Sequence, residues 1–194
     1  MSPEAFIAGM GGARNSAPAP PLPTLAPGPR GHWLLGSLAD YRRDRLGFMP
    51  LAQRLAELVQ ACFTGIWVES HEHEDALAEI ASLCREQAWQ LMSWDLDQGI
   101  RMSGAVDLAD TVTDPLAAIR SLTVIESKQD SSCLLVLRNF HRFLQSAEIV
   151  QALVRQLASG KQHRTFVVIL APLVQIPVEL EKQFIVIEHV ATGT

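Results

Sequence analysis

The chain has 194 residues, 48% of them hydrophobic and 19% charged, which suits one globular domain with a single core and an additional tail. Its formal net charge of −5 at pH 7 argues against a nucleic-acid partner, because affinity for a phosphate backbone comes mainly from clustered lysine and arginine. The sequence shows no signal-peptide pattern, and its longest apolar run, residues 166–174, is too short to span a bilayer. We therefore expect a cytoplasmic protein that binds neither nucleic acid nor membrane.

Residues 1–49 are predicted to form a tail and linker outside the domain. Seven of the eleven prolines lie before residue 30, and such a segment buries too little apolar surface to offset the entropy of ordering. We expect residues 1–30 to be disordered. Residues 25–49 begin Leu-Ala-Pro-Gly-Pro-Arg-Gly-His-Trp and resemble the proline-rich N-terminal segment of a cytochrome P450. The haem-binding cysteine segment of a P450 is absent from the sequence, so we expect no haem.

Beyond residue 50 the hydrophobic pattern alternates between helical and strand periodicity. Helices are predicted at residues 51–62, 71–87, 115–125 and 146–159. Strands are predicted at residues 65–70, 89–94, 165–171 and 184–190, and the third strand along the chain begins at residue 133. The stretch that follows the second strand, up to residue 112, contains glycine and is predicted to be irregular.

The helix boundaries rest on capping residues. Asp114 or Thr113 is expected to cap one helix, with Pro115 in its first turn. Ser146 is expected to cap the next helix, and Gly160 to end it. Behind these caps, apolar residues such as Ile119, Leu122, Ile125 and Leu153 recur at helical spacing and are expected to face the core.

Cysteine and tryptophan are expected to serve the core. Cys62, Cys84 and Cys133 are far apart and fall on apolar positions, which favours reduced, buried thiols over a disulfide framework or a zinc site. Trp67, Trp89 and Trp94 belong to predicted strands and are expected to fill the interior.

Apolar strands that alternate with helices indicate a parallel sheet covered on both faces. The sequence therefore predicts an α/β domain over residues 50–190, a three-layer sandwich around a five-stranded, mainly parallel sheet.

The order of elements is also that of the nucleotide-binding core of AAA+ ATPases. From Leu51 to Val190 the chain resembles the N-terminal region of an uncharacterised AAA+ ATPase family of bacteria and plastids. The resemblance is carried by Ile-Trp-Val-Glu-Ser-His-Glu-His-Glu (66–74), Asp-Pro-Leu-Ala-Ala (114–118), Leu-Val-Leu-Arg-Asn-Phe-His-Arg-Phe-Leu (135–144) and Ile-Pro-Val-Glu-Leu-Glu-Lys (176–182). It implies a P-loop NTPase-like topology in a region that precedes the catalytic ATPase domain.

The residues expected of an active ATPase are missing from this stretch. A phosphate-binding loop needs glycines and a lysine after the first strand, but Ser70 is followed by His-Glu-His-Glu-Asp, whose carboxylates would repel a triphosphate. The third strand ends in Arg138-Asn139 in place of two carboxylates for magnesium and water. Ala171-Pro172 follows the fourth strand without a polar sensor, and Glu181-Lys182-Gln183 contains no arginine finger. We therefore expect no ATP hydrolysis by this chain.

The leading hypothesis is a non-catalytic, AAA+-like regulatory or protein-interaction domain, whose partner is either an AAA+ ATPase or a second copy of the chain. The alternative is a domain that binds a nucleotide or another small molecule at the C-terminal edge of the sheet, where Pro172 also lies. Under either hypothesis, the candidate ligand or partner surface consists of Ser70, His71, Glu72, Asp95, Asn139, His141 and Arg142.

Two further possibilities stay open. The run His71-Glu72-His73-Glu74 offers imidazole and carboxylate ligands, but it lacks the spacing that places two histidines on one helix face, so a solvated helix start is favoured over a metal site. An enzyme could use His141 with Asp95 or Glu72, although His141 is more simply a loop histidine bonded to backbone. A nucleophilic Cys133 is disfavoured by its place at the start of a strand. We expect no cofactor and no metal.

Overall fold

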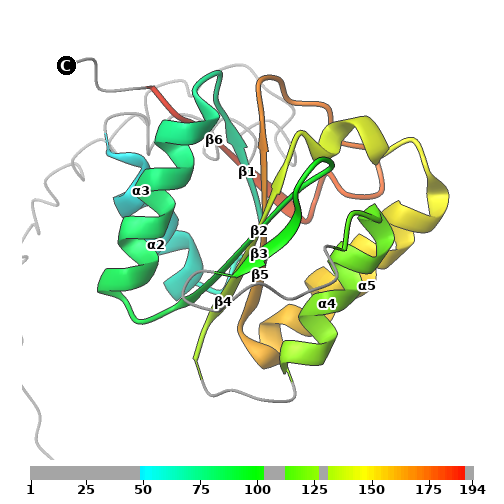
Figure 1. Ribbon diagram of the computed structural model, residues 1–194, viewed down its shortest axis with the longest axis horizontal. Coiled ribbons are helices and arrows are strands. Elements are labelled where there is room, and N and C mark those ends of the chain that lie inside the picture. The colour runs from blue at the N-terminus through cyan, green and yellow to red at the C-terminus, as the bar shows by residue number, and fades with distance from the viewer. Residues whose placement is uncertain (1–48, 103–111, 127–130, 191–194) are drawn as a thin grey trace, which may run out of the picture.

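The computed structural model describes residues 49–102, 112–126 and 131–190, which form a layered α/β arrangement (Figure 1). Six strands form one sheet in the order β3-β2-β4-β5-β1-β6. The strands are β1 (Gly65–Glu69), β2 (Gln90–Asp95), β3 (Gly99–Met102), β4 (Cys133–Arg138), β5 (Thr165–Ala171) and β6 (Phe184–Glu188). The predicted fold class is thereby confirmed.

Every pairing in the sheet is parallel except that of β2 with β3. The first strand, β1, lies between β5 and β6, so the order of strands in the sheet differs from their order along the chain. Consequently the carboxyl ends of all five parallel strands lie at the same edge.

The strand β3 was missed by the sequence prediction, which treated this stretch as irregular. Asp95 Oδ1 accepts hydrogen bonds from the N–H groups of Asp97 and Gln98, at 3.0 and 2.6 Å, and these bonds turn the chain. Gly99 then adopts a φ of 66°, which glycine tolerates without steric cost. With only four residues, β3 is too short to display a periodicity of its own.

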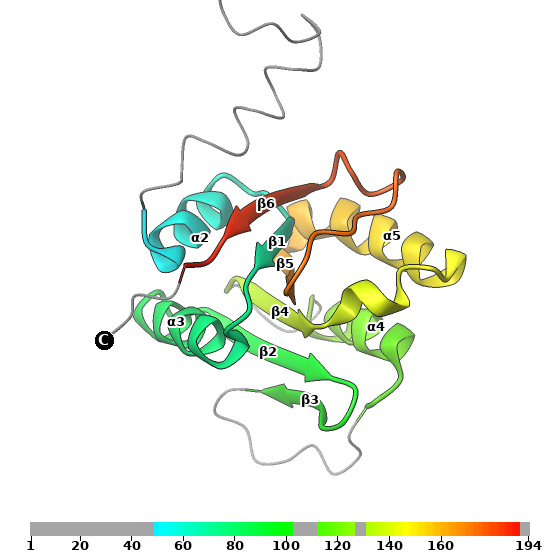
Figure 2. The same ribbon diagram turned by 90° about the horizontal axis from the view of Figure 1, so that it is seen from above.

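Helices cover both faces of the sheet (Figure 2). The helices α2 (Leu51–Gln60) and α3 (His73–Glu86) cover one face, and α4 (Pro115–Glu126) and α5 (Ala147–His163) cover the other. Side chains of successive strand residues point to opposite faces. In β1, Ile66 and Val68 therefore join the core beneath α2 and α3, whereas Trp67 joins the core beneath α4 and α5.

Two of the expected caps differ in their chemistry. Asp114 Oδ2 accepts a hydrogen bond of 2.7 Å from the N–H of Ala117, which confirms the predicted start of α4. Ser146 occupies the N-cap position of α5 but its side chain makes no capping bond. The side chain of Ile125, expected in the core, lies outside the described residues.

Gly160 does not end its helix, contrary to the prediction. The helix α5 continues to His163, and Arg164 reverses the chain with a φ of 52°. A Cβ atom on Gly160 would lie 2.3 Å from the carbonyl oxygen of Thr165. The glycine is thus required by the close approach of α5 to β5, and not by the end of the helix.

Two of the three tryptophan side chains predicted for the core are fully buried. Trp67 and Trp94 are fully buried, whereas Trp89 is half-buried just before β2. Cys84 and Cys133 are buried and Cys62 is half-buried, and none of the three forms a disulfide bond. No helix among the described residues is long and apolar enough to cross a membrane. The predicted disordered tail and its boundary at residue 50 stay predictions, because residues 1–48 lie outside the described part.

Candidate functional site at the C-terminal edge of the sheet

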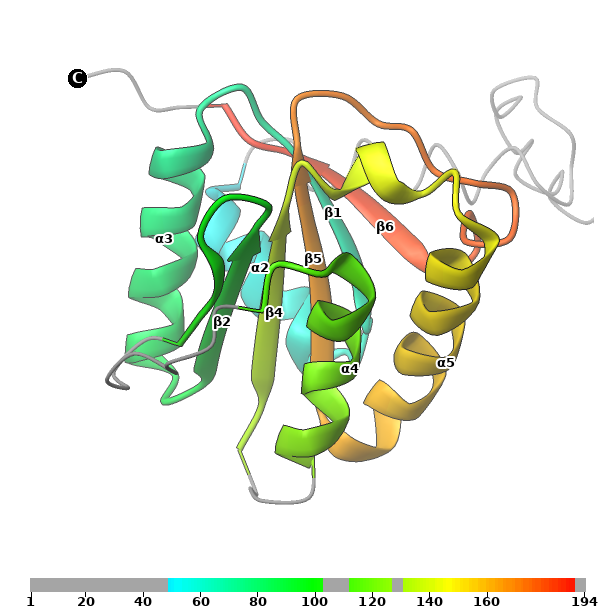
Figure 3. The same cartoon turned by 45° about the vertical axis from the view of Figure 1, so that its right-hand side comes forward.

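Four connections lie together at the C-terminal edge of the sheet (Figure 3). They are the β1–α3 connection, the β2–β3 hairpin, the short 3₁₀ helix η1 (Phe140–Phe143) and the β5–β6 connection. Ligand sites of α/β proteins form at this edge, since parallel strands direct their loops there. The structure therefore brings the predicted surface residues to one end of the molecule.

Arg138, the last residue of β4, forms the centre of an ion-pair cluster. Its Nη2 atom lies 2.5 Å from Glu74 Oε1 in the first turn of α3, and its Nη1 atom lies 3.6 Å from Asp95 Oδ2 at the end of β2. The Arg138 and Asp95 side chains are only 21% and 23% exposed, whereas Glu74 is 77% exposed. Two carboxylates therefore compensate this partly buried cation and connect three elements.

A depression of about 460 Å³ opens beside this cluster. It contains three of the predicted surface residues, Asp95, Asn139 and Arg142. Its full lining is Glu74, Asp95, Leu96, Asp97, Gln98, Arg138, Asn139, Arg142 and Phe143. Leu96 at the hairpin tip is 60% exposed, so the depression combines charged groups with an accessible apolar side chain.

Asn139 produces the sharp turn after β4. Its φ of 53° and ψ of 26° are left-handed, a region that asparagine tolerates better than most residues. Its N–H still donates to the carbonyl of Leu170 at 2.9 Å, so the sheet pairing extends to the turn. Below the turn, Trp94 packs edge-to-face on Phe140 and Phe143, with ring centroids 5.3 and 5.7 Å apart. Of these three aromatic side chains, Phe143 lines the depression, whereas Trp94 and Phe140 are fully buried.

The surroundings of His141 and His73 lower the pKa of both imidazoles. Burial lowers the pKa of His141, and the nearby charge of Arg142 lowers it further. Burial also lowers the pKa of His73, and the charge of Arg138 lowers it further, whereas a hydrogen bond to the backbone of Ser70 and the charge of Glu74 oppose the shift. His141 Nδ1 and His73 Nε2 lack hydrogen-bond partners within the described structure. At Nδ1, the side chain of His141 therefore lacks the backbone hydrogen bond that was expected.

Ser70 is buried away from the depression, in a hydrogen-bonded chain that the sequence prediction missed. Its Oγ atom lies 2.8 Å from His189 Nδ1 and accepts a 3.0 Å bond from the N–H of Glu72. His189 Nε2 in turn lies 3.4 Å from Glu79 Oε1. Nothing in the sequence pairs Ser70 with His189, since 119 positions separate them.

A Ser-His-Glu chain resembles the relay of hydrolases, but its burial here argues against nucleophilic chemistry. Ser70 is 2% exposed and His189 9%, so a substrate cannot reach the hydroxyl group. The chain connects β1, α3 and the residue after β6. We therefore interpret it as a structural connection.

The remaining predicted residues lie at the same edge of the sheet but outside the depression. His71 and Glu72 are exposed in the β1–α3 connection, and Pro172 is half-buried after β5, but none of these three lines the depression. Within the described ranges, no group of three or more His, Cys, Asp or Glu side chains is arranged to hold a metal ion. Cys133 Sγ is buried 3.9 Å from Met92 Sδ, in surroundings that suit a structural thiol.

Comparison with known proteins decides the family. Residues 51–189 match the family described as SpoVK-like AAA ATPase, N-terminal domain. The chain belongs to this family. A search of curated proteins found no significant match.

Two solved structures resemble this SpoVK-like N-terminal domain at low sequence identity. One is a chain of the E. coli MS115-1 HORMA:CdnC:Trip13 complex, with a TM-score of 0.50, 10% identity and coverage of 81% of this chain. The other is C. elegans PCH-2, with a TM-score of 0.44, 7% identity and coverage of 74%. The chain spans 66% and 42% of the length of these two proteins. The first of them supports the fold.

The family match confirms the resemblance to an AAA+ ATPase N-terminal region and leaves the resemblance to cytochrome P450 without support. It begins at residue 51, and none of the comparisons supports a relation of residues 25–49 to cytochrome P450. In the SpoVK-like N-terminal domain, the β1–α3 connection contains neither glycine nor lysine, and Arg138 stands at the end of the third parallel strand along the chain.

Proposed function

We propose that the chain is a non-catalytic protein-interaction domain of the AAA ATPase system, which regulates or assembles an ATPase without hydrolysing ATP itself. The observation that carries this proposal is the ion-pair cluster of Arg138 with Glu74 and Asp95. A magnesium ion at the end of β4 would meet the guanidinium group there, and a triphosphate at the start of α3 would meet carboxylates.

Accessible apolar side chains at the same edge support a protein partner. Leu96 is 60% exposed on the β2–β3 hairpin, and Leu173 and Val174 are 44% and 37% exposed after β5. Val178, further along the β5–β6 connection, is 79% exposed. Exposed apolar side chains rimmed by charged residues such as Arg142 and Asp97 are typical of protein-binding surfaces.

The proposal is tested by capture of partners from the native cell with the full chain as bait. We expect an AAA+ ATPase to be recovered by the wild type and lost with the double variant Leu96→Glu, Leu173→Glu. The matched control is Arg85→Glu, an exposed change on α3, which should retain the partner. Recovery of no AAA+ protein, or equal recovery with all variants, contradicts the proposal, as does ATP hydrolysis by the purified chain.

The depression of about 460 Å³ favours a second candidate function, the binding of a small molecule. Asn139 and Arg142 would supply hydrogen bonds there, and Phe143 would supply apolar contact. Calorimetry with ATP, ADP and AMP in the absence of magnesium tests the nucleotide version. Heat that disappears in Arg142→Ala supports it, whereas no heat at millimolar nucleotide removes it.

A further inference from the structure

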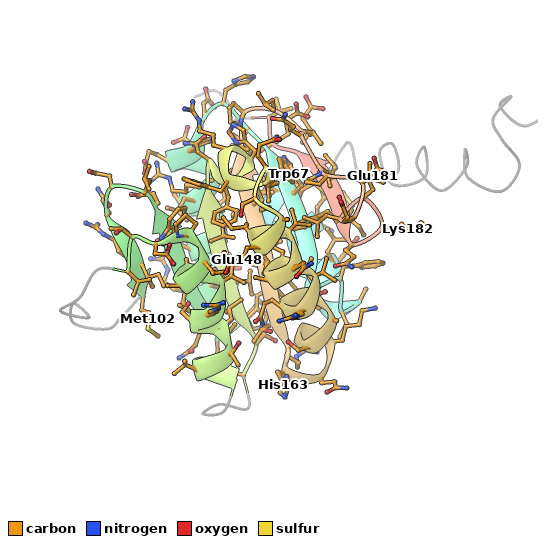
Figure 4. All side chains as sticks on the ribbon, turned by 90° about the vertical axis from the view of Figure 1, so that its right-hand side faces the viewer. Trp67, Met102, Glu148, His163, Glu181 and Lys182 are labelled. Atoms are coloured by element: carbon orange, nitrogen blue, oxygen red, sulfur yellow. The ribbon has the colours of Figure 1, made fainter. Side chains whose placement is uncertain are left out.

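The strand β6 forms one outer edge of the described sheet, and β1 is its one hydrogen-bonded neighbour there (Figures 2 and 4). In Figure 4, Glu181 and Lys182 mark the turn that leads into this strand. An open edge strand presents unpaired N–H and C=O groups and invites pairing with another strand. The backbone groups on this edge can be identified one by one.

Hydrogen bonds to β1 fix which residues of β6 face outward. The N–H of His189 donates to the carbonyl of Glu69 at 2.8 Å, so His189 directs its backbone groups toward β1. Successive strand residues direct these groups to opposite sides, so Ile187 and Ile185 also face β1. Phe184, Val186 and Glu188 therefore face the open edge.

Two of the outward groups already have partners inside the chain. The carbonyl of Glu188 accepts a 2.7 Å hydrogen bond from Nη1 of Arg54, a side chain of α2 that is only 5% exposed. The N–H of Phe184 donates to the carbonyl of Leu180 at 3.2 Å. The groups that remain open on the described edge are the carbonyl of Phe184, both groups of Val186 and the N–H of Glu188.

We propose that β6 pairs with β6 of a second copy of this chain, antiparallel, about a two-fold axis at Val186. In this register Val186 lies opposite Val186 of the other copy, and the two residues exchange both hydrogen bonds. Phe184 lies opposite Glu188, whose N–H donates to the Phe184 carbonyl. The pairing uses every open group of both edges, and the two groups that it leaves out are those bonded to Leu180 and Arg54.

The side chains are compatible with the same register. Ile185 lies opposite Ile187 of the second copy, on the α2 and α3 face of the sheet. Glu188 lies opposite Phe184, so no like charges face each other across the axis. The resulting dimer has one continuous sheet. Its interface, the β6 edge, is distinct from the C-terminal edge of the sheet, where we propose that a protein partner binds.

Sedimentation of the full chain over a range of concentrations tests the dimer. We expect a monomer–dimer equilibrium in the wild type. Val186→Pro removes two of the intermolecular hydrogen bonds and should raise the dimer dissociation constant by at least about tenfold. The N–H of Val186 is not used by β1, so the intramolecular sheet remains paired. Val186→Thr keeps the N–H and the branched shape and should dimerise like the wild type.

Disulfide formation gives a second, independent measurement, made in a Cys62→Ala background. Val186→Cys should cross-link with itself, because paired residues in this register have Cα atoms about 5.5 Å apart. Glu188→Cys is the matched control, since its two copies lie four positions, about 14 Å, apart and are too distant to bridge. A wild type that stays monomeric at millimolar concentration, equal dimerisation of Val186→Pro, or equal cross-linking of both cysteine variants overturns the proposal. None of these outcomes bears on the C-terminal edge, so the proposed function is judged separately.

Discussion

Arg138 and Glu74 lie 2.5 Å apart across the C-terminal edge of the sheet, although 64 positions separate them in the chain. Arg138 also lies 3.6 Å from Asp95, whose side chain is only 23% exposed. The two carboxylates differ in burial, so the contributions of the two ion pairs to stability should also differ.

Arg138→Met should lower the free energy of unfolding by about 1–3 kcal/mol, because Asp95 is left partly buried without its cation. Glu74→Gln should change it by less than about 0.5 kcal/mol, since Glu74 is 77% exposed and its charge is screened by water. Urea unfolding of both variants measures the difference. Equal losses of unfolding free energy in the two variants would contradict the prediction that the pair with Asp95 contributes more.

The stability of the domain should fall at mildly acidic pH because of His73 and His141. The pKa of each is lowered in the folded state, mainly by burial, whereas an unfolded histidine has a pKa of about 6.5. Below about pH 6.5 the unfolded chain therefore binds more protons than the folded one, and stability that is complete above this pH is lost as pH falls.

The check is NMR titration of the two imidazoles together with urea unfolding at several pH values. The double variant His73→Gln, His141→Gln should show a flatter loss of stability below pH 6.5. His71→Gln, an exposed change in the β1–α3 connection, is the matched control for the substitution of an imidazole by an amide. Titration of both His73 and His141 at or above pH 6.5 refutes the prediction.

Ser70→Ala should destabilise the domain more than Glu79→Gln does. Loss of the hydroxyl leaves His189 Nδ1 and the N–H of Glu72 without their partner, and an unsatisfied buried group costs about 1–3 kcal/mol. The bond to Glu79 is longer, at 3.4 Å, and that side chain is 34% exposed. Thermal unfolding compares the two, and a larger effect of Glu79→Gln would show that the ion pair dominates.

Gly160→Ala should be among the most destabilising single substitutions in α5. The added Cβ would lie 2.3 Å from the Thr165 carbonyl oxygen, so the helix or the strand must move, at a cost of about 2–4 kcal/mol. Alanine normally stabilises a helix relative to glycine, so a loss of stability in Gly160→Ala would be opposite to the effect of helix propensity. Ala158→Ser, an exposed change in the same helix, should alter stability by less than about 0.5 kcal/mol.

Cys84 should resist alkylation in the folded protein. Burial raises the pKa of its thiol to about 11, so little thiolate exists at pH 8. Cys62 is half-buried and should react with iodoacetamide at least about tenfold faster than Cys84. Mass spectrometry of partly alkylated protein locates the label, and both thiols should react alike once the chain is unfolded in urea.

Much of the fold follows from local patterns in the sequence. The apolar run of β5 is predicted to the residue, since a strand buried on both faces is apolar throughout. Asp114 and Pro115 correctly place the start of α4, because a capping carboxylate and a proline act within one turn. The absence of glycine and lysine after β1, and the presence of Arg138 at the end of the third parallel strand, are likewise properties of the sequence itself.

Other features depend on close approach between distant segments and have no local signal. Gly160 reads as a helix stop, but its role comes from the carbonyl of Thr165 against its Cα atom. Ser70 was predicted at a ligand surface, yet it bonds His189 in the interior. The tertiary structure also places Asp95, but not His141, in the lining of the depression, and it joins Arg138 to Glu74 and Asp95. The sequence thus determined the layers and the absence of glycine and lysine after β1, whereas only the folded chain decided which polar groups meet, because hydrogen bonds and ion pairs act over a few ångströms in space and not along the chain.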